Sequence, residues 1–347
     1  MYLGELLQSR NNNLDLFRVI AAVLVIYGHA PLFVPNQATQ DFVYDMLRFD
    51  YSGSLAVKFF FMLSGLLVTQ SLLLRPAIKP FLVKRAARIF PGLIVCLLVS
   101  VFVVGMVLTS LKTSAYLQHP QTWNYLLRNS LLFSLQWNLP GVFENANTSV
   151  VNGSLWTLPI EVLCYISLAA YSVTAMRYSK RLASLLLLVP IGVFLIENPL
   201  VLNYFAAFND ALMLGGCFCI GTFFALYQQQ IAINAKGVAL GAIALALLWS
   251  SPLQMLCFYC VFFYVCLYLG STGTVNRYLK IPGDPSYGIY IYGFVIQHLV
   301  AQLLPNQSLI VNQWGAVLIA LPVGYLSWYC VERPALSWAK NRFANQS

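Results

Sequence analysis

Long runs of apolar residues recur along the whole sequence and set the strongest limit on its fold. A helix needs about 20 mostly apolar residues to cross the hydrocarbon core of a bilayer. These runs are continuously apolar and do not alternate with polar residues, which favours spanning helices over a barrel. The sequence therefore predicts an all-α, polytopic transmembrane helix bundle with about ten spanning helices. The runs cover about 14–34, 53–74, 88–110, 154–176, 182–198, 203–227, 236–250, 252–270, 285–304 and 312–331.

The composition excludes several classes of protein. Of the 347 residues, 59% are hydrophobic and only 9% are charged, whereas about 25% of residues are charged in a typical soluble domain. A water-soluble enzyme, a disordered protein and a nucleic-acid-binding domain are therefore ruled out. The eight cysteines lie in apolar stretches with neither metal-finger nor disulfide spacing, which is typical of small buried hydrophobes. We expect no nucleic-acid partner, no metal site and no permanently bound cofactor.

Basic residues predict which side of the membrane each connection occupies, because cytoplasmic connections carry an excess of Lys and Arg. If the amino terminus is cytoplasmic and ten helices alternate, only four of the 20 basic residues face outward. Both termini are therefore predicted to be cytoplasmic. Arg10, Arg277 and Lys280 are among the cytoplasmic residues, and the four outward ones are Arg48, Lys58, Lys112 and Arg128.

The longest polar connection, about 111–153, is predicted to lie outside the cytoplasm, with an amphipathic segment at the membrane surface. His119, within it, is expected to be a solvated histidine. The sequence shows no internal repeat and no second soluble domain. We therefore expect one integral-membrane domain over residues 1–347, without a fused soluble domain, in which any catalysis takes place within the lipid bilayer or at its surface.

Arg18 and His29 are ionisable residues within the first predicted span, where such groups usually mark functional sites. The separation of eleven positions amounts to about three helical turns, so both side chains share one face, about 16 Å apart along the axis. Arg18 then lies near the cytoplasm and His29 in the outer half, with Asp15 close enough to pair with Arg18. The alternative makes Arg18 a snorkelling anchor and His29 a packing residue. Their shared face favours a functional role for the pair.

Glu161 is predicted at a similar depth to His29, about 10 Å along the fourth span from its outer end. If the two helices are neighbours, the carboxylate can orient the imidazole of His29 and raise its basicity. A structural ion pair that holds helices together would explain Glu161 equally well.

Arg85 and Arg88 share a helix face at the cytoplasmic mouth of the third span. Two guanidinium groups on one face suit a phosphate clamp. The positive-inside rule alone also explains basic residues at this position.

Other polar residues have an ordinary structural explanation beside a functional one. Asp210 and His298 fall in the outer halves of predicted spans and are interpreted as supporting residues. Ser64 would ordinarily serve close helix packing. Tyr287 and Tyr290 are typical of an interfacial aromatic belt.

Taken in order, these signatures resemble the membrane acyltransferase family 3, from about Leu14 to Pro334. Six short motifs carry the resemblance, each weak alone but together in the family's order. They are Leu14–Asp15 followed by Arg18 and His29; Phe60–Phe61 with Ser64–Gly65; Arg85 with Arg88; Trp156 with Leu158 and Glu161; the SYGIY stretch at 286–290; and the VERP stretch at 331–334.

The resemblance implies acyl transfer, usually of acetyl, from cytoplasmic acetyl-CoA to a hydroxyl of an extracytoplasmic glycan such as an O-antigen or exopolysaccharide. It also implies a multi-pass protein of the bacterial inner membrane. On this basis His29 is the catalytic base or acyl carrier and Arg18 is its partner, with Asp15 and Glu161 as further catalytic candidates. The implied acyl-donor contacts are Arg85, Arg88, Ser64, Tyr287 and Tyr290, and the acceptor-side candidates are Lys58, Trp156, Asp210 and His298.

Two positions depart from the family pattern and bear on acceptor choice. Lys58 replaces an acidic or amide residue, and Gly293 replaces a histidine present in many relatives. The competing interpretation is a proton-coupled secondary transporter with His29, Glu161 and Asp210 as a relay. The sequence shows no inverted repeat, which would have favoured a transporter. A glycan flippase or polymerase is a third interpretation. The sequence specifies neither the acceptor nor the oligomeric state.

Overall fold

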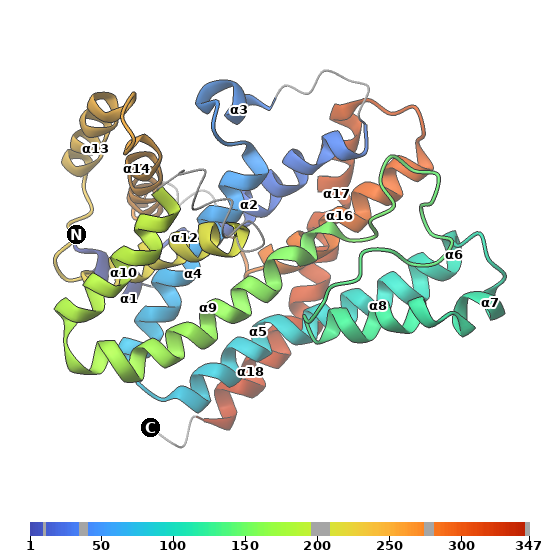
Figure 1. Ribbon diagram of the computed structural model, residues 1–347, viewed down its shortest axis with the longest axis horizontal. Coiled ribbons are helices and arrows are strands. Elements are labelled where there is room, and N and C mark those ends of the chain that lie inside the picture. The colour runs from blue at the N-terminus through green and yellow to red at the C-terminus, as the bar shows by residue number, and fades with distance from the viewer. Residues whose placement is uncertain (10–11, 35–40, 196–208, 274–280, 344–347) are drawn as a thin grey trace. The chain divides into compact units, whose positions relative to one another are not determined.

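The computed structural model describes residues 1–9, 12–34, 41–195, 209–273 and 281–343, and these ranges are built from helices (Figure 1). The β pairing within them is limited to an isolated antiparallel bridge between Tyr2 and Ala232. The all-α prediction is therefore confirmed for the described chain. Arg10, Arg277 and Lys280, which the charge rule counted as cytoplasmic, lie outside the described residues.

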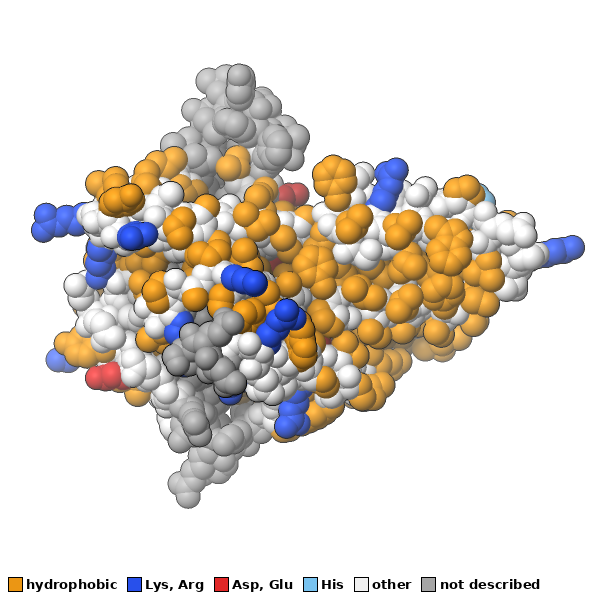
Figure 2. Space-filling model, turned by 90° about the horizontal axis from the view of Figure 1, so that it is seen from below, with side chains coloured by type: hydrophobic (Ala, Val, Ile, Leu, Met, Phe, Trp, Pro, Cys, Tyr) orange, Lys and Arg blue, Asp and Glu red, His pale blue; other side chains and the backbone are white. Residues whose placement is uncertain are grey.

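Within the described ranges, six helices are long and apolar enough to cross a membrane. They correspond to the first, second, third, fourth, sixth and tenth predicted spans, although residues 203–208 of the sixth lie outside the described chain. Hydrophobic side chains are exposed over much of the face that Figure 2 presents, as expected for helices surrounded by lipid. The six segments are Leu14–Leu32, Ser52–Leu74, Ile78–Leu108, Gly153–Met176, Asn209–Leu226 and Leu309–Arg342.

The other four predicted spans form helices that are either short or less apolar. α10 (Lys180–Leu195), α13 (Ala235–Leu248) and α14 (Gln254–Gly270) have 16, 14 and 17 residues, fewer than the about 20 that a span needs. Residues 196–198 of the fifth predicted span lie outside the described chain. α16 (Ser286–Leu303) has 18 residues but carries tyrosine, glutamine and histidine side chains. The total of ten spans and the cytoplasmic placement of both termini stay predictions.

Two compact units make up the chain, and each combines segments that are distant in the sequence. Four helices contribute residues to both units: α2 (Leu14–His29), α4 (Ser52–Leu74), α5 (Ile78–Val99) and α9 (Leu158–Tyr171). The single domain expected over residues 1–347 stays a prediction. Unit 1 contains Met1–Arg18, Val57–Phe81 and Leu163–Pro282, and unit 2 contains Val19–Ala56, Leu82–Val162 and Gly283–Ser347.

In unit 1, glycines allow α4 to approach α12 (Asn209–Leu226) closely. A Cβ atom on Gly65 would collide with the carbonyl oxygen of Phe218, and one on Gly221 would collide with the carbonyl oxygen of Met62. Such contacts between small residues are a common basis of helix association in membranes. The Ser-Gly pair of α4 therefore provides helix packing through its glycine. Unit 1 also holds α1 (Leu3–Gln8), the α10–α12 pair and the α13–α14 pair.

Unit 2 is organised around α16, whose residues from Ser286 to His298 are all buried. α17 (Leu309–Ser327) packs along it, and a Cβ atom on Gly288 would come within 2.9 Å of the Gly324 Cα. The 3-10 turn Gly153–Thr157, which precedes α9, also packs against α16. α16 is therefore enclosed by other elements of its unit along most of its length.

The remaining elements of unit 2 are short helices and π-helical segments. The predicted outer connection, about 111–153, contains two of these helices and otherwise irregular chain. The elements are α3 (Phe42–Leu47), the π-helical segment Ser100–Gly105 after α5, α6 (Met106–Leu108), α7 (Thr113–Gln118), α8 (Pro120–Ser130), the π-helical segment Trp328–Glu332 after α17, and α18 (Arg333–Arg342).

We predict that Gly221→Ala lowers the thermal stability of the protein, whereas Gly215→Ala in the same helix does not. The new methyl group at position 221 would collide with the Met62 backbone, and overpacking costs about 1–3 kcal/mol. A Cβ atom on Gly215 would have no described neighbour within 4 Å, so this change only improves helix propensity. Unfolding temperatures in detergent, followed by tryptophan fluorescence, test the difference. Equal temperatures for the two variants would contradict the close α4–α12 contact.

Candidate functional site

His29 is the last residue of α2, and the residues after it explain why the helix ends there. Pro31 lacks a backbone N–H and lies in a 3-10 turn, Ala30–Leu32, so the α-helix does not continue past it. The His29 ring packs edge-on against Phe294 of α16, with 5.4 Å between the ring centroids. Its Nδ1 atom is buried and has no hydrogen-bond partner among the described residues. Such a nitrogen is placed to bond a substrate or to accept a proton.

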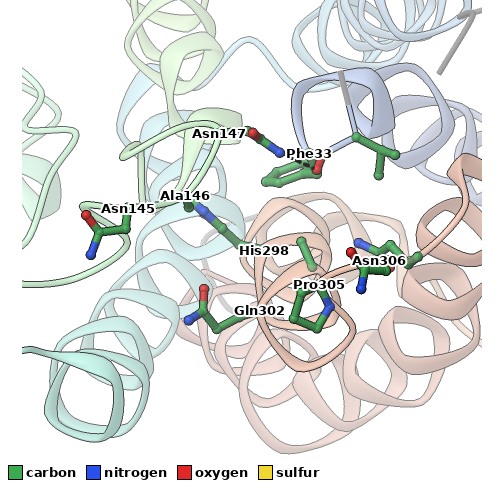
Figure 3. Close-up of a pocket in the computed structure, with 11 residues that line it drawn as sticks. Phe33, Asn145, Ala146, Asn147, His298, Gln302, Pro305 and Asn306 are labelled. Carbon is green, nitrogen blue, oxygen red and sulfur yellow. Dashed lines mark hydrogen bonds between the residues drawn. The ribbon is translucent and has the colours of Figure 1, made fainter. Parts of the chain in front are cut away.

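A cluster of aromatic side chains in mutual contact extends from His29 to a cavity of about 470 Å³ (Figure 3). Phe33 lines the cavity and packs edge-on against both Phe294 and His298, with centroid distances of 5.0 and 5.1 Å. His298 also lines the cavity and stacks flat on Phe143, with 3.5 Å between the ring centroids. The structure thus brings two of the predicted site residues, His29 and His298, into one aromatic cluster within unit 2.

Tyr287 and Tyr290 lie nearer the amino-terminal end of α16 than His298 does. The Tyr287 hydroxyl donates to the backbone carbonyl of Ile89 at 2.8 Å. The hydroxyls of Tyr290 and Thr157 share a hydrogen bond of 2.7 Å. Both tyrosines, predicted as donor contacts, therefore use their hydroxyls for hydrogen bonds within the protein. Their role toward an acyl donor stays a prediction.

Glu161 lies in the first turn of α9, close enough to Tyr287 and Tyr290 for electrostatic interaction. The contacts that His29 makes within the described ranges do not include this carboxylate. The neighbours of Glu161 in unit 2 are thus the α16 tyrosines. Trp156 is half-buried in the 3-10 turn that packs against the same helix.

Arg88 is the centre of a buried ion cluster near the amino-terminal end of α16. Its Nη2 atom lies 2.6 Å from a carboxylate oxygen of Asp284, and its Nη1 atom lies 3.3 Å from a carboxylate oxygen of Glu332. The hydroxyl of Ser286 donates to Asp284, and that of Ser327 donates to Glu332 at 2.9 Å. Arg88, Asp284 and Glu332 are only 9%, 8% and 1% exposed. Two carboxylates thus neutralise and position one guanidinium.

One member of the predicted phosphate clamp, Arg88, takes part in this ion cluster. Arg88 is engaged by Asp284 and Glu332, so a phosphate would have to compete with two carboxylates for its hydrogen bonds. Arg85 lies one turn earlier in α5 and is half-buried. Donor binding by either arginine stays a prediction.

Three other candidates lie in unit 1. Lys58 is only 3% exposed and donates from its Nζ atom to the Tyr259 hydroxyl at 3.0 Å. The hydroxyls of Ser64 and Tyr165 share a hydrogen bond of 3.1 Å. Asp210 is exposed in the first turn of α12. Within the described ranges, no three His, Cys, Asp or Glu side chains are grouped so that they could hold a metal ion.

Asp15 and Arg18 also belong to unit 1, near the start of α2. Asp15 is exposed and Arg18 is half-buried. α2 runs without a break from Leu14 to His29, as the spacing between Arg18 and His29 requires. The catalytic roles implied for Asp15 and Arg18 stay predictions.

Sequence reasoning misses the polar partners that hold unit 2 together. Asp284 lies just before the SYGIY stretch, and Glu332 lies within the VERP stretch. An acidic residue near a cytoplasmic helix end that is rich in basic residues indicates a counter-ion. Asn152 gives no such signal. Its amide nitrogen donates to the Ile291 carbonyl of α16 at 2.8 Å, and its amide oxygen accepts from the Ser154 backbone N–H.

The charge rule predicts opposite sides of the membrane for the cavity and for the ion cluster. The cavity is lined by the end of α2, the connection about 111–153 and the end of α16, all predicted to lie outside the cytoplasm. The ion cluster joins the middle of α5, the residue Asp284 just before α16 and the π-helical segment after α17, all predicted to lie on the cytoplasmic side. Along α16, Tyr287 and His298 are about 16 Å apart.

The sequence matches an acyltransferase family model and is similar to two named proteins. Residues 11–333 match a family model described as an acyltransferase domain. An O-acetyl transferase of Shigella phage Sf6 is 27% identical over 344 residues, which cover 94% of this chain and 97% of the relative. Nodulation protein 10 of Rhizobium leguminosarum bv. viciae is 26% identical over 359 residues, which cover 94% of each protein. No solved structure matches the chain.

We predict that Arg88→Ala lowers the free energy of unfolding by about 3–5 kcal/mol, because it leaves two buried carboxylates without their counter-charge. Arg75→Ala is the matched control, since Arg75 is exposed and surface changes cost about 0.5 kcal/mol or less. Unfolding temperatures of both variants in detergent provide the measurement. An Arg88→Ala protein as stable as the Arg75→Ala protein would show that the cluster is not structural.

Proposed function

The chain belongs to this acyltransferase family, and we propose that it is an O-acetyltransferase of the bacterial inner membrane. The donor is cytoplasmic acetyl-CoA, and the acceptor is a hydroxyl of an extracytoplasmic glycan such as an O-antigen or exopolysaccharide. The phage relative, whose name states O-acetyl transfer, supports the identity of the transferred group. The six long, apolar helices support the placement of the protein in a lipid bilayer. Neither the donor nor the acceptor is a nucleic acid.

The observation that carries the proposal is the position of His29. Its ring lies at the end of a long apolar helix, against Phe294, and its buried Nδ1 atom has no partner within the described chain. A histidine with a purely structural role would satisfy such a nitrogen with a protein group. An imidazole that must bond a substrate keeps the nitrogen available.

His29 can promote acetyl transfer by either of two routes. As a general base, the neutral imidazole takes the proton from the acceptor hydroxyl while the hydroxyl oxygen attacks the thioester carbonyl. The carbon–sulfur bond breaks, the ester forms, and the coenzyme A thiolate leaves and takes up the proton. As an acyl carrier, His29 first attacks the thioester carbonyl and expels the coenzyme A thiolate, which takes up the imidazole proton. The acetyl group then passes from His29 to the hydroxyl oxygen, and the hydroxyl proton returns to the imidazole. Both routes need the imidazole uncharged.

The ion cluster changes the role proposed for Arg88, whose guanidinium already bonds Asp284 and Glu332. Arg85 keeps the donor-phosphate contact implied by the resemblance. Arg88 positions the start of α16 and contributes a donor contact only in competition with those carboxylates. The other candidates keep the roles implied by the resemblance: Arg18, Asp15 and Glu161 with His29; Ser64, Tyr287 and Tyr290 with the donor; and Lys58, Trp156, Asp210 and His298 with the acceptor.

The proton-coupled transporter is the weaker interpretation. A relay needs a chain of hydrogen-bonded groups, yet His29 does not contact Glu161 within the described chain. Asp210 is exposed. Membership of an acyltransferase family also favours group transfer over transport.

We predict that His29→Ala reduces acetyl transfer by about 10²–10⁴-fold, the usual contribution of a general base. The measurement is the transfer of radiolabel from [14C]acetyl-CoA to glycans of membranes that contain the variant, at matched protein abundance. His119→Asn is the control, because His119 caps α8 through its Nδ1 atom and asparagine is an equally good cap. Acetylation that survives His29→Ala would reject His29 as base and carrier alike.

A further inference from the structure

We propose that the cavity beside His298 binds a neutral, hydroxyl-rich sugar ring of the acceptor. This inference rests on the proposed O-acetyltransferase function and deepens it by naming the chemical class of the acceptor. The cavity volume of about 470 Å³ lies within the range of small-ligand sites. Its walls come from unit 2 alone: the turn after α2, the segment 145–147, and the end of α16 with the residues that follow it (Figure 3).

Carboxamide side chains dominate the polar part of this lining. Each carboxamide offers one oxygen that accepts hydrogen bonds and an NH₂ group that donates two. A sugar hydroxyl also donates and accepts, so amides on opposite walls match a ring that carries several hydroxyls. Figure 3 shows such groups on the connection, on the end of α16 and on the residues that follow it. They are Asn145, Asn147, Gln302, Asn306 and Gln307.

The described lining contains no group that would select a charged sugar. None of the eleven described residues around the cavity is Lys, Arg, Asp or Glu. A carboxylate or phosphate on the ligand is normally held by Arg or Lys, because charge-assisted hydrogen bonds are the strong ones. A uronic acid or a phosphorylated sugar would lose water here without gaining a counter-ion. The cavity therefore favours an uncharged ring.

His298 provides a second, independent sign of a ligand. Its side chain lines the cavity although the residue is only 1% exposed. The backbone of Thr148 and Val150 approaches the ring, yet neither ring nitrogen makes a hydrogen bond of normal geometry to a described residue. Stacking on Phe143 holds the imidazole in place. Buried polar atoms usually have partners, and a sugar hydroxyl in the cavity would supply one.

The cavity also lies close to the proposed reactive imidazole. Phe33 forms part of its wall and packs against Phe294, and Phe294 packs against His29. The Phe33 backbone carbonyl accepts a hydrogen bond of 2.9 Å from the Asn147 amide, which ties the connection to the end of α2. A ring held by the amides would thus present its hydroxyls beside the residue that activates them.

Saturation-transfer NMR on the full chain in phosphatidylcholine nanodiscs, which avoid sugar-based detergents, tests the proposal. The probes are methyl α-D-glucopyranoside, methyl α-L-rhamnopyranoside and the methyl glucuronide as the charged counterpart. We expect both neutral glycosides to bind and the glucuronide to bind at least about fivefold more weakly. Gln302→Ala and Asn306→Ala should each weaken binding of the neutral glycosides about three- to tenfold. Asn124→Ala, an exposed amide on α8 outside the cavity, should leave it unchanged.

The possible outcomes separate this proposal from the proposed function. Equal or tighter binding of the glucuronide would overturn the sugar site, and so would unchanged binding by both amide variants. A chain that transfers acetyl but binds neither neutral glycoside would overturn it as well. His29→Ala should still bind the glycosides, because His29 does not line the cavity. A wild-type chain that binds them but transfers no acetyl would overturn the enzyme assignment and leave the sugar site standing.

Discussion

The burial of α16 is the constraint on which unit 2 depends. From Ser286 to His298 no residue of this helix is exposed, so each of its polar groups needs a partner within the protein. Tyr287 and Tyr290 find theirs in a backbone carbonyl and a threonine hydroxyl. Gln297 donates to the Ile26 carbonyl at 2.8 Å, one turn before His29. That last bond fixes the end of α2 against α16 and thereby places the imidazole.

The Arg88 cluster shows how one residue satisfies two requirements at once. A basic residue near the cytoplasmic end of a span follows from the positive-inside rule, and this one also bonds Asp284 and Glu332. The two carboxylates lie just before α16 and at the start of α18. A single guanidinium therefore links three segments that are far apart in the sequence. The basic motif of α5 is part of the architecture whatever it contributes to donor binding.

Sequence alone predicted the features that depend on local pattern and missed those that depend on distant contacts. Continuous apolar runs were enough to predict an all-α protein and the six long helices. The spans predicted at α13 and α14 stay predictions, because hydropathy does not reveal how many residues keep helical geometry. The buried ionisable residue His29 was identifiable because charge inside an apolar run is rare. Asn152 and the cavity amides were not, since neutral residues in connections are common and their contacts depend on partners that the fold supplies.

The absence of Lys, Arg, Asp and Glu from the described lining of the cavity has a consequence for the conditions under which such a protein works. Attraction between opposite charges weakens as dissolved ions accumulate, because the Debye length shrinks from about 30 Å at 0.01 M to about 3 Å at 1 M salt. Amide hydrogen bonds have no comparable dependence. Binding of a neutral sugar in this cavity is therefore expected to change little with the salt concentration of the medium.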